Sequence, residues 1–469
     1  MDVEDRPTLL MLGEGEPMRA GLEEALARHA TFAEAADAAS PVAAVMAAAP
    51  DLVVLVGDAV RDHEAILKKL AGNALTSVVP VVLLTPGGLD VQLSAARRGV
   101  AVVRRTASVD EMAGRIAQLA RELPERPAKT GGSVEEATLG ELLEIVQREL
   151  QGGILSVTQE GGEGSARFVL KPGRNVDAAI RDFVRRIKPL LQQEKPLHYE
   201  LDDPGTGKLA VLDEADVGDR GVFRGRRVLL VEDDAAAADA LAQELRAHGA
   251  TVAVCTSAGG GLERARTLDP EVVLIDEAAL DGETWAVLQQ IRRDLGLRWA
   301  SILVVRLTEV LPEGEAPRMD RLAGSFAPLL AADGEIRERV ATEEGFETRL
   351  EALGPSRLLH ALAEGGQTLH VLVRHPRANV EVSIAEGLVA GAEALPMGDA
   401  ARRVAGTAAL ATLLALGSGR VRVERREAPA TANLLMPVRD AMVSAAQEAP
   451  PIRPSLPAPK QRATATPPA

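Results

Sequence analysis

The sequence is poor in aromatic residues and contains one cysteine, Cys255. Aromatic residues make up 2% of the 469 residues, whereas hydrophobic residues together reach 46%. The buried cores must therefore be built mainly from Ala, Val and Leu. One cysteine excludes an intramolecular disulfide and fits a reducing cytoplasm. We interpret Cys255 as a small buried residue of a strand.

Long apolar runs and an excess of positive charge are also missing. No run of about twenty apolar residues is free of charge, so we predict no membrane span. The acidic start, Met-Asp-Val-Glu-Asp-Arg, does not resemble a secretory signal. The formal charge of -15 and a pI near 5.2 argue against non-specific binding of nucleic acid. The composition therefore predicts a soluble cytoplasmic protein without a nucleic-acid partner.

The motifs of common enzymes are absent. Asp203–Leu209 approaches a phosphate-binding loop, but the spacing is missing and Lys208 is followed by Leu. The closest histidines, His370 and His375, have an odd spacing that places them on opposite faces of a strand, so they predict no zinc site. No nucleophile elbow or Ser/His/Asp arrangement is visible. We therefore do not expect an enzyme.

Two short apolar segments end abruptly in acid. They are Val228–Asp234, which reads VLLVEDD, and Pro270–Asp276, which reads PEVVLID. Such runs are typical of strands buried on both faces of a parallel sheet. The acids then lie at the carboxyl ends of the strands, where open α/β sheets hold their ligands. Converging carboxylates require a cation, and hard oxygen ligands suit Mg²⁺.

These residues resemble the receiver domain of two-component response regulators. On that resemblance Glu232 and Asp233 are the acidic pair that binds Mg²⁺, and Asp276 is a further metal ligand and the phosphoacceptor. The resemblance implies a flavodoxin-like (CheY-like) sheet and a histidine kinase or phosphotransfer protein as partner. The alternative is a generic α/β domain whose strands end in acids for solubility.

The receiver signature is incomplete. The family has a hydroxyl residue after the fourth strand, but Arg306 follows the expected strand at 301–305. Thr308 supplies that hydroxyl only if the end of the strand is shifted. The family also has a lysine after the fifth strand, yet no lysine occurs between Lys208 and Lys460. Arg306 and Thr308 are therefore the candidate switch residues, although a guanidinium does not replace an ammonium directly.

A decayed copy of the same pattern opens the chain. Thr8–Glu16 takes the place of a first strand and its acidic end, and Pro50–Asp58 matches Pro270–Asp276 closely. The phosphoacceptor position holds Val56, while Thr85 and Arg105 match the hydroxyl and lysine positions. We predict a pseudo-receiver that acts as a docking or dimerising surface. Three acids form either a residual cluster or ordinary exposed loop residues: Glu14, Glu16 and Asp58.

A second pattern follows each receiver-like segment. The first copy predicts a helix, a strand pair, a further strand and a helix at 139–150, 153–158, 166–170, 175–179 and 183–191. The second copy predicts a helix at 350–362, strands at 368–373, 380–384 and 388–392, a helix at 407–416 and a strand at 420–424. Gly173 and Gly387 fall at corresponding turns. The order therefore suggests duplication of a two-domain unit.

This α+β pattern resembles the PATAN-type domain, which occurs beside receivers in bacterial signalling proteins. The resemblance implies a module for protein–protein interaction, in some cases linked to motility machinery. It rests on apolar strands and one shared glycine. The predicted organisation is a pseudo-receiver at 8–122, a linker at 123–132, a module at 133–216, a receiver at 226–345, a module at 346–445 and a disordered Pro/Ala-rich tail at 446–469.

The predicted function is that of a response-regulator-type signalling protein in a phosphorelay. Asp276 accepts the phosphoryl group, and the PATAN-like modules pass the signal to a protein effector, with motility control as one candidate process. The alternative is a phosphate-independent scaffold that uses the receiver faces for docking and homodimerisation. A transcription factor is disfavoured by the negative charge. Residues from about 195 to 225 are either a linker or part of the first module.

Overall fold

The computed structural model describes residues 6–13, 16–33, 40–56, 65–67, 69–70, 72–85, 101–105, 108–122, 131–134, 153–159, 165–170, 185–190, 197–202, 209–211, 218–255, 262–277, 284–312, 315–397 and 402–454. The chain forms two compact units. Unit 1 comprises residues 1–127 and 332–469, and unit 2 comprises residues 128–331. Among the described helices, none combines the length and the apolar character that a membrane crossing requires.

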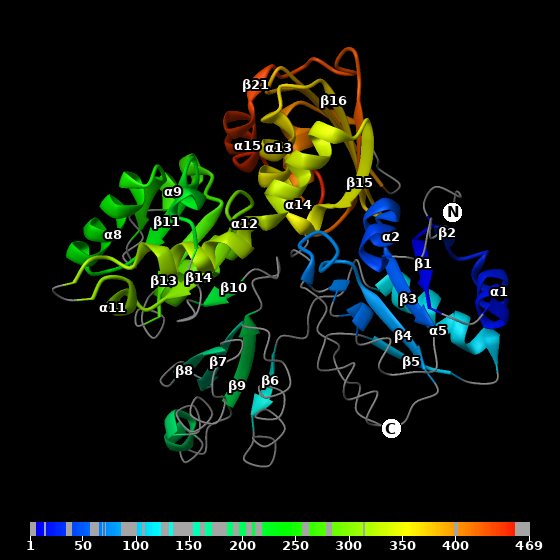
Figure 1. Ribbon diagram of the computed structural model, residues 1–469, viewed down its shortest axis with the longest axis horizontal. Coiled ribbons are helices and arrows are strands. Elements are labelled where there is room, and N and C mark those ends of the chain that lie inside the picture. The colour runs from blue at the N-terminus through cyan, green and yellow to red at the C-terminus, as the bar shows by residue number, and fades with distance from the viewer. Residues whose placement is uncertain are drawn as a thin grey trace. The chain divides into compact units, whose positions relative to one another are not determined.

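Unit 1 begins with a five-stranded parallel sheet in the order β2-β1-β3-β4-β5 (Figure 1). Its strands are β1 Thr8–Leu12, β2 Thr31–Ala33, β3 Leu52–Val56, β4 Val81–Thr85 and β5 Ala101–Arg104, and its helices are α1 Glu16–Leu26, α2 Pro41–Ala48 and α5 Val109–Glu122. Every residue of β1 and β3 is buried, as a central parallel strand requires. The strand order is the flavodoxin-like order that the sequence predicts.

Unit 2 contains a second parallel sheet, in the order β10-β14-β13-β11-β12. Its strands are β10 Leu209–Val211, β11 Arg227–Val231, β12 Thr251–Cys255, β13 Val272–Asp276 and β14 Ser301–Val305. Its helices are the short η2 Arg220–Phe223, then α8 Ala235–Ala247, α9 Leu262–Leu268, α10 Thr284–Arg293, α11 Leu307–Val310 and α12 Met319–Thr342. β11, β12, β13 and β14 take the first four places of the flavodoxin-like order. The fifth place is taken by β10, which precedes the domain in the chain.

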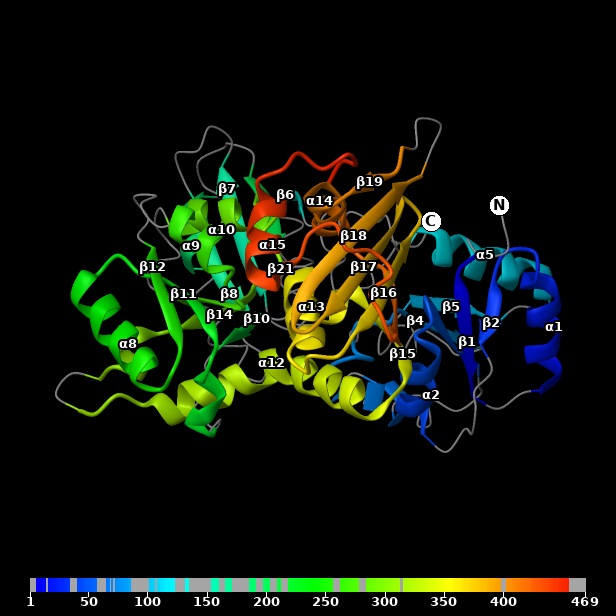
Figure 2. The ribbon, with the colours of Figure 1, turned by 90° about the horizontal axis from the view of Figure 1, so that it is seen from above.

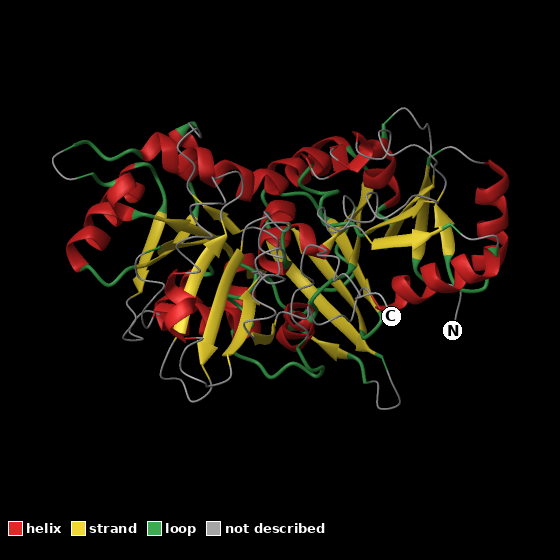
Figure 3. Cartoon of the chain, turned by 90° about the horizontal axis from the view of Figure 1, so that it is seen from below, coloured by secondary structure: helices red, strands yellow, loops and turns green. Residues whose placement is uncertain are grey.

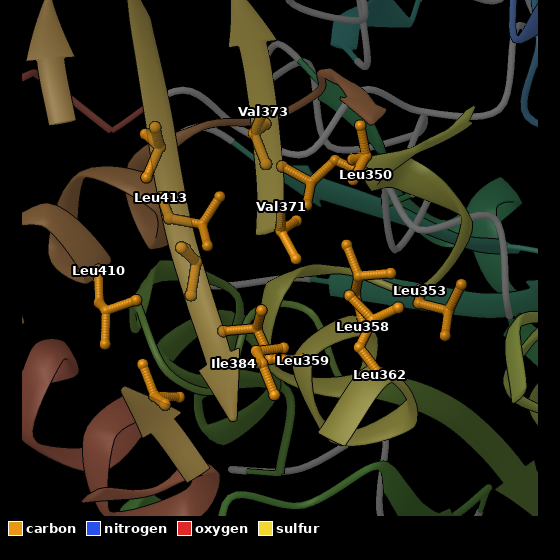
Figure 4. Close-up of a cluster of buried hydrophobic side chains, with 14 of the residues drawn as sticks. Leu350, Leu353, Leu358, Leu359, Leu362, Val371, Val373, Ile384, Leu410 and Leu413 are labelled. Carbon is orange, nitrogen blue, oxygen red and sulfur yellow. The ribbon is translucent and has the colours of Figure 1, made fainter. Parts of the chain in front are cut away.

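A seven-stranded antiparallel sheet completes unit 1 (Figure 2). Its strands are β15 Gly345–Arg349, β16 Leu369–His375, β17 Ala378–Ala385, β18 Leu388–Pro396, β19 Val404–Ala405, β20 Arg420–Arg425 and β21 Met436–Pro437, and its helices are η4 Leu350–Ala352, α13 Pro355–Ala363, α14 Thr407–Ala415 and α15 Val438–Ala446. Leucines of α13 and α14 meet Val371, Val373 and Ile384 in an aliphatic core (Figure 4). This core contains almost no aromatic side chains, as the composition predicts.

A four-stranded antiparallel sheet lies in unit 2 (Figure 3). Its strands are β6 Gly131–Val134, β7 Gly153–Gln159, β8 Ser165–Leu170 and β9 Leu197–Asp202. Their order, β6-β9-β7-β8, reproduces the order β15-β20-β16-β17 of the larger sheet. In both sheets the strand that comes last in the chain, β9 or β20, lies between the first strand and a hairpin. The shared topology supports the duplication inferred from the sequence.

The structure also departs from the predicted elements. β6, β9, β15 and α15 were not predicted, and the helix expected over 350–362 is interrupted at Gly354, whose φ is +82°. Pro355 then begins α13. Ile452 packs against the core within the predicted disordered tail. The predicted elements at 139–150 and 175–179 lie outside the described residues.

The described residues between 195 and 225 contribute to two different sheets. They are therefore neither only a linker nor only a part of the first module. β9 joins the four-stranded sheet, whereas β10 pairs in parallel with β14 of the second parallel sheet. Phe223 is fully buried in the core formed by α8, α12 and the parallel strands. β10 therefore adds a fifth strand to the second parallel sheet from a part of the chain that precedes the predicted domain. The predicted boundary at 216 was wrong here, because it placed β10 in the preceding module.

Candidate functional site

The candidate site lies at the carboxyl ends of β11 and β13. Val231 pairs with Ile275 in the parallel register, so Glu232 follows one strand where Asp276 ends the other. Asp233 comes next in the chain. The structure therefore brings the ends of the two predicted acidic segments to the same edge of the sheet.

Glu232 is the most deeply buried acid at this edge, with 5% of its surface exposed. Its Oε1 accepts the backbone N–H of Asp234 at 2.8 Å, whereas its Oε2 is buried without a hydrogen-bond partner. Burial raises the pKa of Glu232, and the charges of Asp276 and Asp233 add to this rise. A buried carboxylate oxygen without a donor, beside two further acids, is a position that a cation would stabilise.

The neighbouring acids have different roles. Asp276 is half-buried, and its Oδ1 accepts the backbone N–H of Leu307 at 3.2 Å. Asp233 is exposed. Asp234 caps α8, because its carboxylate accepts the N–H groups of Ala236 and Ala237 at 2.9 and 3.1 Å. Asp234 is thus committed to the helix, which leaves Glu232, Asp233 and Asp276 as candidate metal ligands.

These three carboxylates fit Mg²⁺ by their donor chemistry and by the unpartnered Oε2 of Glu232. Within the described residues, however, no three His, Cys, Asp or Glu side chains are already gathered around a common point that suits a metal. The fit therefore lies in the kind and placement of the ligands and not in a preassembled cage. Mg²⁺ commonly keeps several water ligands, so it does not require such a cage.

Arg306 directly follows β14, as the sequence predicts. It occupies the N-cap position of α11, and its guanidinium pairs with Glu277 at 2.9 Å and with Glu309 at 3.3 Å. Glu277 is the residue after Asp276. Glu277 therefore holds the Arg306 guanidinium near Asp276, the candidate phosphoacceptor.

Thr308 lies within α11 and is exposed. β14 ends at Val305, so the shifted strand end that would bring Thr308 to the hydroxyl position is not present.

In the receiver pattern a lysine follows the fifth strand of the sheet. Here the fifth place, next to β14, is taken by β10. β10 runs parallel to β14, so the end of β10 near the carboxylates is its last residue, Val211. The sequence that follows, LDEAD, contains acids and no lysine. The sequence does not predict this strand, because its three residues are too few to show a periodic pattern.

At the corresponding edge of the first parallel sheet, the backbone of Gly13 lies close to that of Val56. Val56 is 4% exposed and joins the hydrophobic core. Gly13 has φ +111°, and a Cβ on it would lie 1.9 Å from the carbonyl oxygen of Val56. Thr85 ends β4, and Arg105 follows β5. Glu14 and Asp58 lie outside the described residues, as does the side chain of Glu16.

Neither the protein-family models nor the curated proteins include a match to this chain. Solved structures of NtrX from Brucella abortus are similar only at a low level. The complex with ADP is 15% identical and covers 72% of this chain and 71% of NtrX, with a TM-score of 0.22. Another NtrX structure is 14% identical and covers 76% and 77%, with a TM-score of 0.20. Similarity this low carries no conclusion about family or function.

Proposed function

We propose that the protein is a response-regulator-type signalling protein that accepts a phosphoryl group on Asp276. The observation that carries the proposal is the buried Oε2 of Glu232, which lacks a hydrogen-bond partner at the strand edge shared with Asp276 and Asp233. The flavodoxin-like order of the strands supports it, because that fold binds ligands at this edge.

In the proposed reaction, an Asp276 oxygen attacks the phosphorus of a phosphohistidine on a kinase or phosphotransfer protein. The O–P bond forms as the N–P bond breaks, and the imidazole leaves. Leu307, whose N–H already reaches the Asp276 carboxylate, orients this nucleophile. A bound Mg²⁺, held by Glu232, Asp233 and Asp276, would supply positive charge for the phosphoryl oxygens.

The expected output is a change in protein–protein contacts. A phosphoryl group adds negative charge next to the pair formed by Arg306 and Glu277 and competes with Glu277 for the guanidinium. The antiparallel modules, if PATAN-like, would then bind a protein effector differently, and motility is the candidate process. We place this activity in the cytoplasm and expect no catalytic turnover.

The test is incubation with Mg²⁺ and acetyl phosphate, followed by intact-mass measurement. We expect one added phosphoryl group in the parent and none in Asp276→Asn. Asp239→Asn, an exposed acid on α8, is the matched control and should be labelled like the parent. Labelling that persists in Asp276→Asn contradicts the assignment of the phosphoacceptor.

A second candidate function is a phosphate-independent scaffold that docks or dimerises through its parallel-sheet domains. The pairing of Arg306 with Glu277 and the lack of lysine between Lys208 and Lys460 favour it. Absence of labelling in the parent, with and without Mg²⁺, would support this alternative.

A further inference from the structure

The amino-terminal edge of the first parallel sheet is joined to the antiparallel sheet of the same unit by a partly buried ion pair. Asp51 precedes β3, and its Oδ2 accepts the backbone N–H of Thr8 at 2.8 Å. Its other carboxylate oxygen pairs with Arg349, the last residue of β15. Arg349 is only 6% exposed and also pairs with Glu351 at 2.9 Å. Asp51 therefore shares with Glu351 the guanidinium that a distant part of the chain supplies.

A second arginine makes the same connection. Arg420 begins β20 and stands directly opposite Arg349 in the antiparallel register. It donates to the Ala48 carbonyl at 3.0 Å and to Thr8 Oγ1, and it pairs with Glu347. Like charges placed directly opposite each other destabilise a strand pair. Each arginine already pairs with an acid of its own module, Glu351 or Glu347, and the first parallel-sheet domain adds a carboxylate, a carbonyl and a hydroxyl.

Apolar contacts extend the same interface. Leu75 is 4% exposed and belongs to the hydrophobic core that includes Ala332 and Ile336 of α12. Met46 of α2 packs against this core, and α2 lies against β15 (Figures 1 and 2). β15 is an edge strand of the seven-stranded sheet. Covering an edge strand protects it from pairing with strands of other molecules.

In the second parallel-sheet domain, the hydrogen bonds and ion pairs that the corresponding acid makes among the described residues stay within the domain. Glu271 takes the place of Asp51, since each follows a proline before the third strand, and it accepts the N–H of Arg227 at 3.1 Å as Asp51 accepts that of Thr8. Glu271 then pairs with Arg226 and Arg227 of its own domain, at 3.4 and 3.7 Å. The corresponding charge is neutralised internally.

We infer that the first parallel-sheet domain is a built-in docking partner of the second antiparallel module. Recognition rests on Asp51 and the opposed pair Arg349 and Arg420, and its effect is to cover β15. The docking edge is the amino-terminal edge of the sheet, opposite the edge where a receiver would bind phosphate. The inference therefore stands whether or not Asp276 is phosphorylated.

Hydrogen–deuterium exchange of the full-length protein tests the inference. Asp51→Arg places a third cation beside Arg349 and Arg420. We expect exchange in α2 and β15 to accelerate roughly tenfold or more, the factor expected for losing a charge-assisted hydrogen bond. The control is Asp110→Arg, the same charge change at an exposed position in α5, which should leave both segments unchanged. Trp285 and Trp299 both lie in unit 2, so tryptophan fluorescence verifies that this unit stays folded.

Arg420→Gln provides an independent test from the other side of the interface and leaves Asp51 and its bond to Thr8 in place. The inference requires faster exchange in both α2 and β15 in this variant. Unchanged exchange of β15 in Asp51→Arg overturns it. So does a response confined in each variant to the domain that carries the substitution, since each residue would then stabilise only its own domain.

Discussion

Glu232 shows at the residue scale how the candidate site differs from an ordinary set of strand-end acids. Its Oε1 is hydrogen-bonded to Asp234, while its Oε2 is buried without a donor. Burial and the neighbouring acids raise its pKa, so its ionised form is costly in the folded protein when no cation is bound. Because the folded pKa lies above the unfolded value of 4.5, this cost grows as the pH rises above 4.5 and is fully present above the folded pKa.

We therefore predict that Glu232→Gln stabilises unit 2 at pH 7.5 in the absence of metal. Glutamine keeps the acceptor for Asp234 and removes the buried charge, so a gain of about 1 kcal/mol is expected. Thermal unfolding followed by tryptophan fluorescence provides the measurement. Added Mg²⁺ should raise the melting temperature of the parent but not of the variant. Equal Mg²⁺ stabilisation of both proteins would count against Glu232 as a ligand.

His375 predicts a pH dependence in unit 1. It is 5% exposed, and its Nδ1 accepts the N–H of Arg377 at 3.1 Å. Burial, with the charges of Arg377 and Arg349, lowers the pKa of His375 from 6.5 to about 4. The unfolded chain takes up this proton first, so stability is fully present above pH 6.5 and is lost as the pH falls towards 4.

The expected loss from His375 is up to about 3 kcal/mol across this window. His375→Asn keeps an acceptor for Arg377 but cannot titrate there. Denaturant unfolding of unit 1, followed by circular dichroism at pH 7 and pH 4.5, should therefore show a smaller loss for the variant. Parallel losses in the two proteins would contradict the prediction.

At the scale of elements, the segment from Gly218 to Phe223 leads into β11 of the second parallel sheet. The N–H of Gly218 donates to the Asp320 carbonyl of α12 at 2.8 Å, and Asp219 caps the short helix η2. Phe223 then contacts Phe326 of α12 with ring centroids 5.0 Å apart. The segment is thus packed directly on the start of α12.

Gly218→Ala should weaken this packing. The added Cβ would lie 2.5 Å from the backbone nitrogen of Gly324, which forces a backbone shift at a cost of about 1–3 kcal/mol. Gly334→Ala is the matched control, because no atom lies within 4 Å of its added Cβ and it is exposed in α12. This control should gain about 0.5–1 kcal/mol. Urea unfolding measures both, and equal effects would refute the close approach at Gly218.

At the scale of the whole molecule, the compact units do not follow the repeat in the sequence. The repeat alternates parallel-sheet and antiparallel domains along the chain. Unit 1 instead combines the first parallel sheet with the last antiparallel sheet, and unit 2 combines the two inner sheets. The duplicated domains thus pair with different neighbours, and Asp51 and Glu271 show how corresponding acids came to serve different contacts.

The sequence by itself determined the two parallel sheets, the hairpins of the antiparallel sheets and the strand ends that carry Glu232, Asp233 and Asp276. These features depend on local patterns, because a strand buried on both faces reads as a continuous apolar run and its polar end marks the sheet edge. The absence of a lysine between Lys208 and Lys460 could likewise be read directly.

Only the tertiary structure decided which partners distant segments find. β10 joins β14 across about ninety residues, a pairing that three residues of sequence cannot specify. Arg306 pairs with Glu277, and Arg349 with Asp51, although many arginines and acids in the sequence were equally available. Ion pairs and edge strands depend on chain geometry, which local periodicity does not contain.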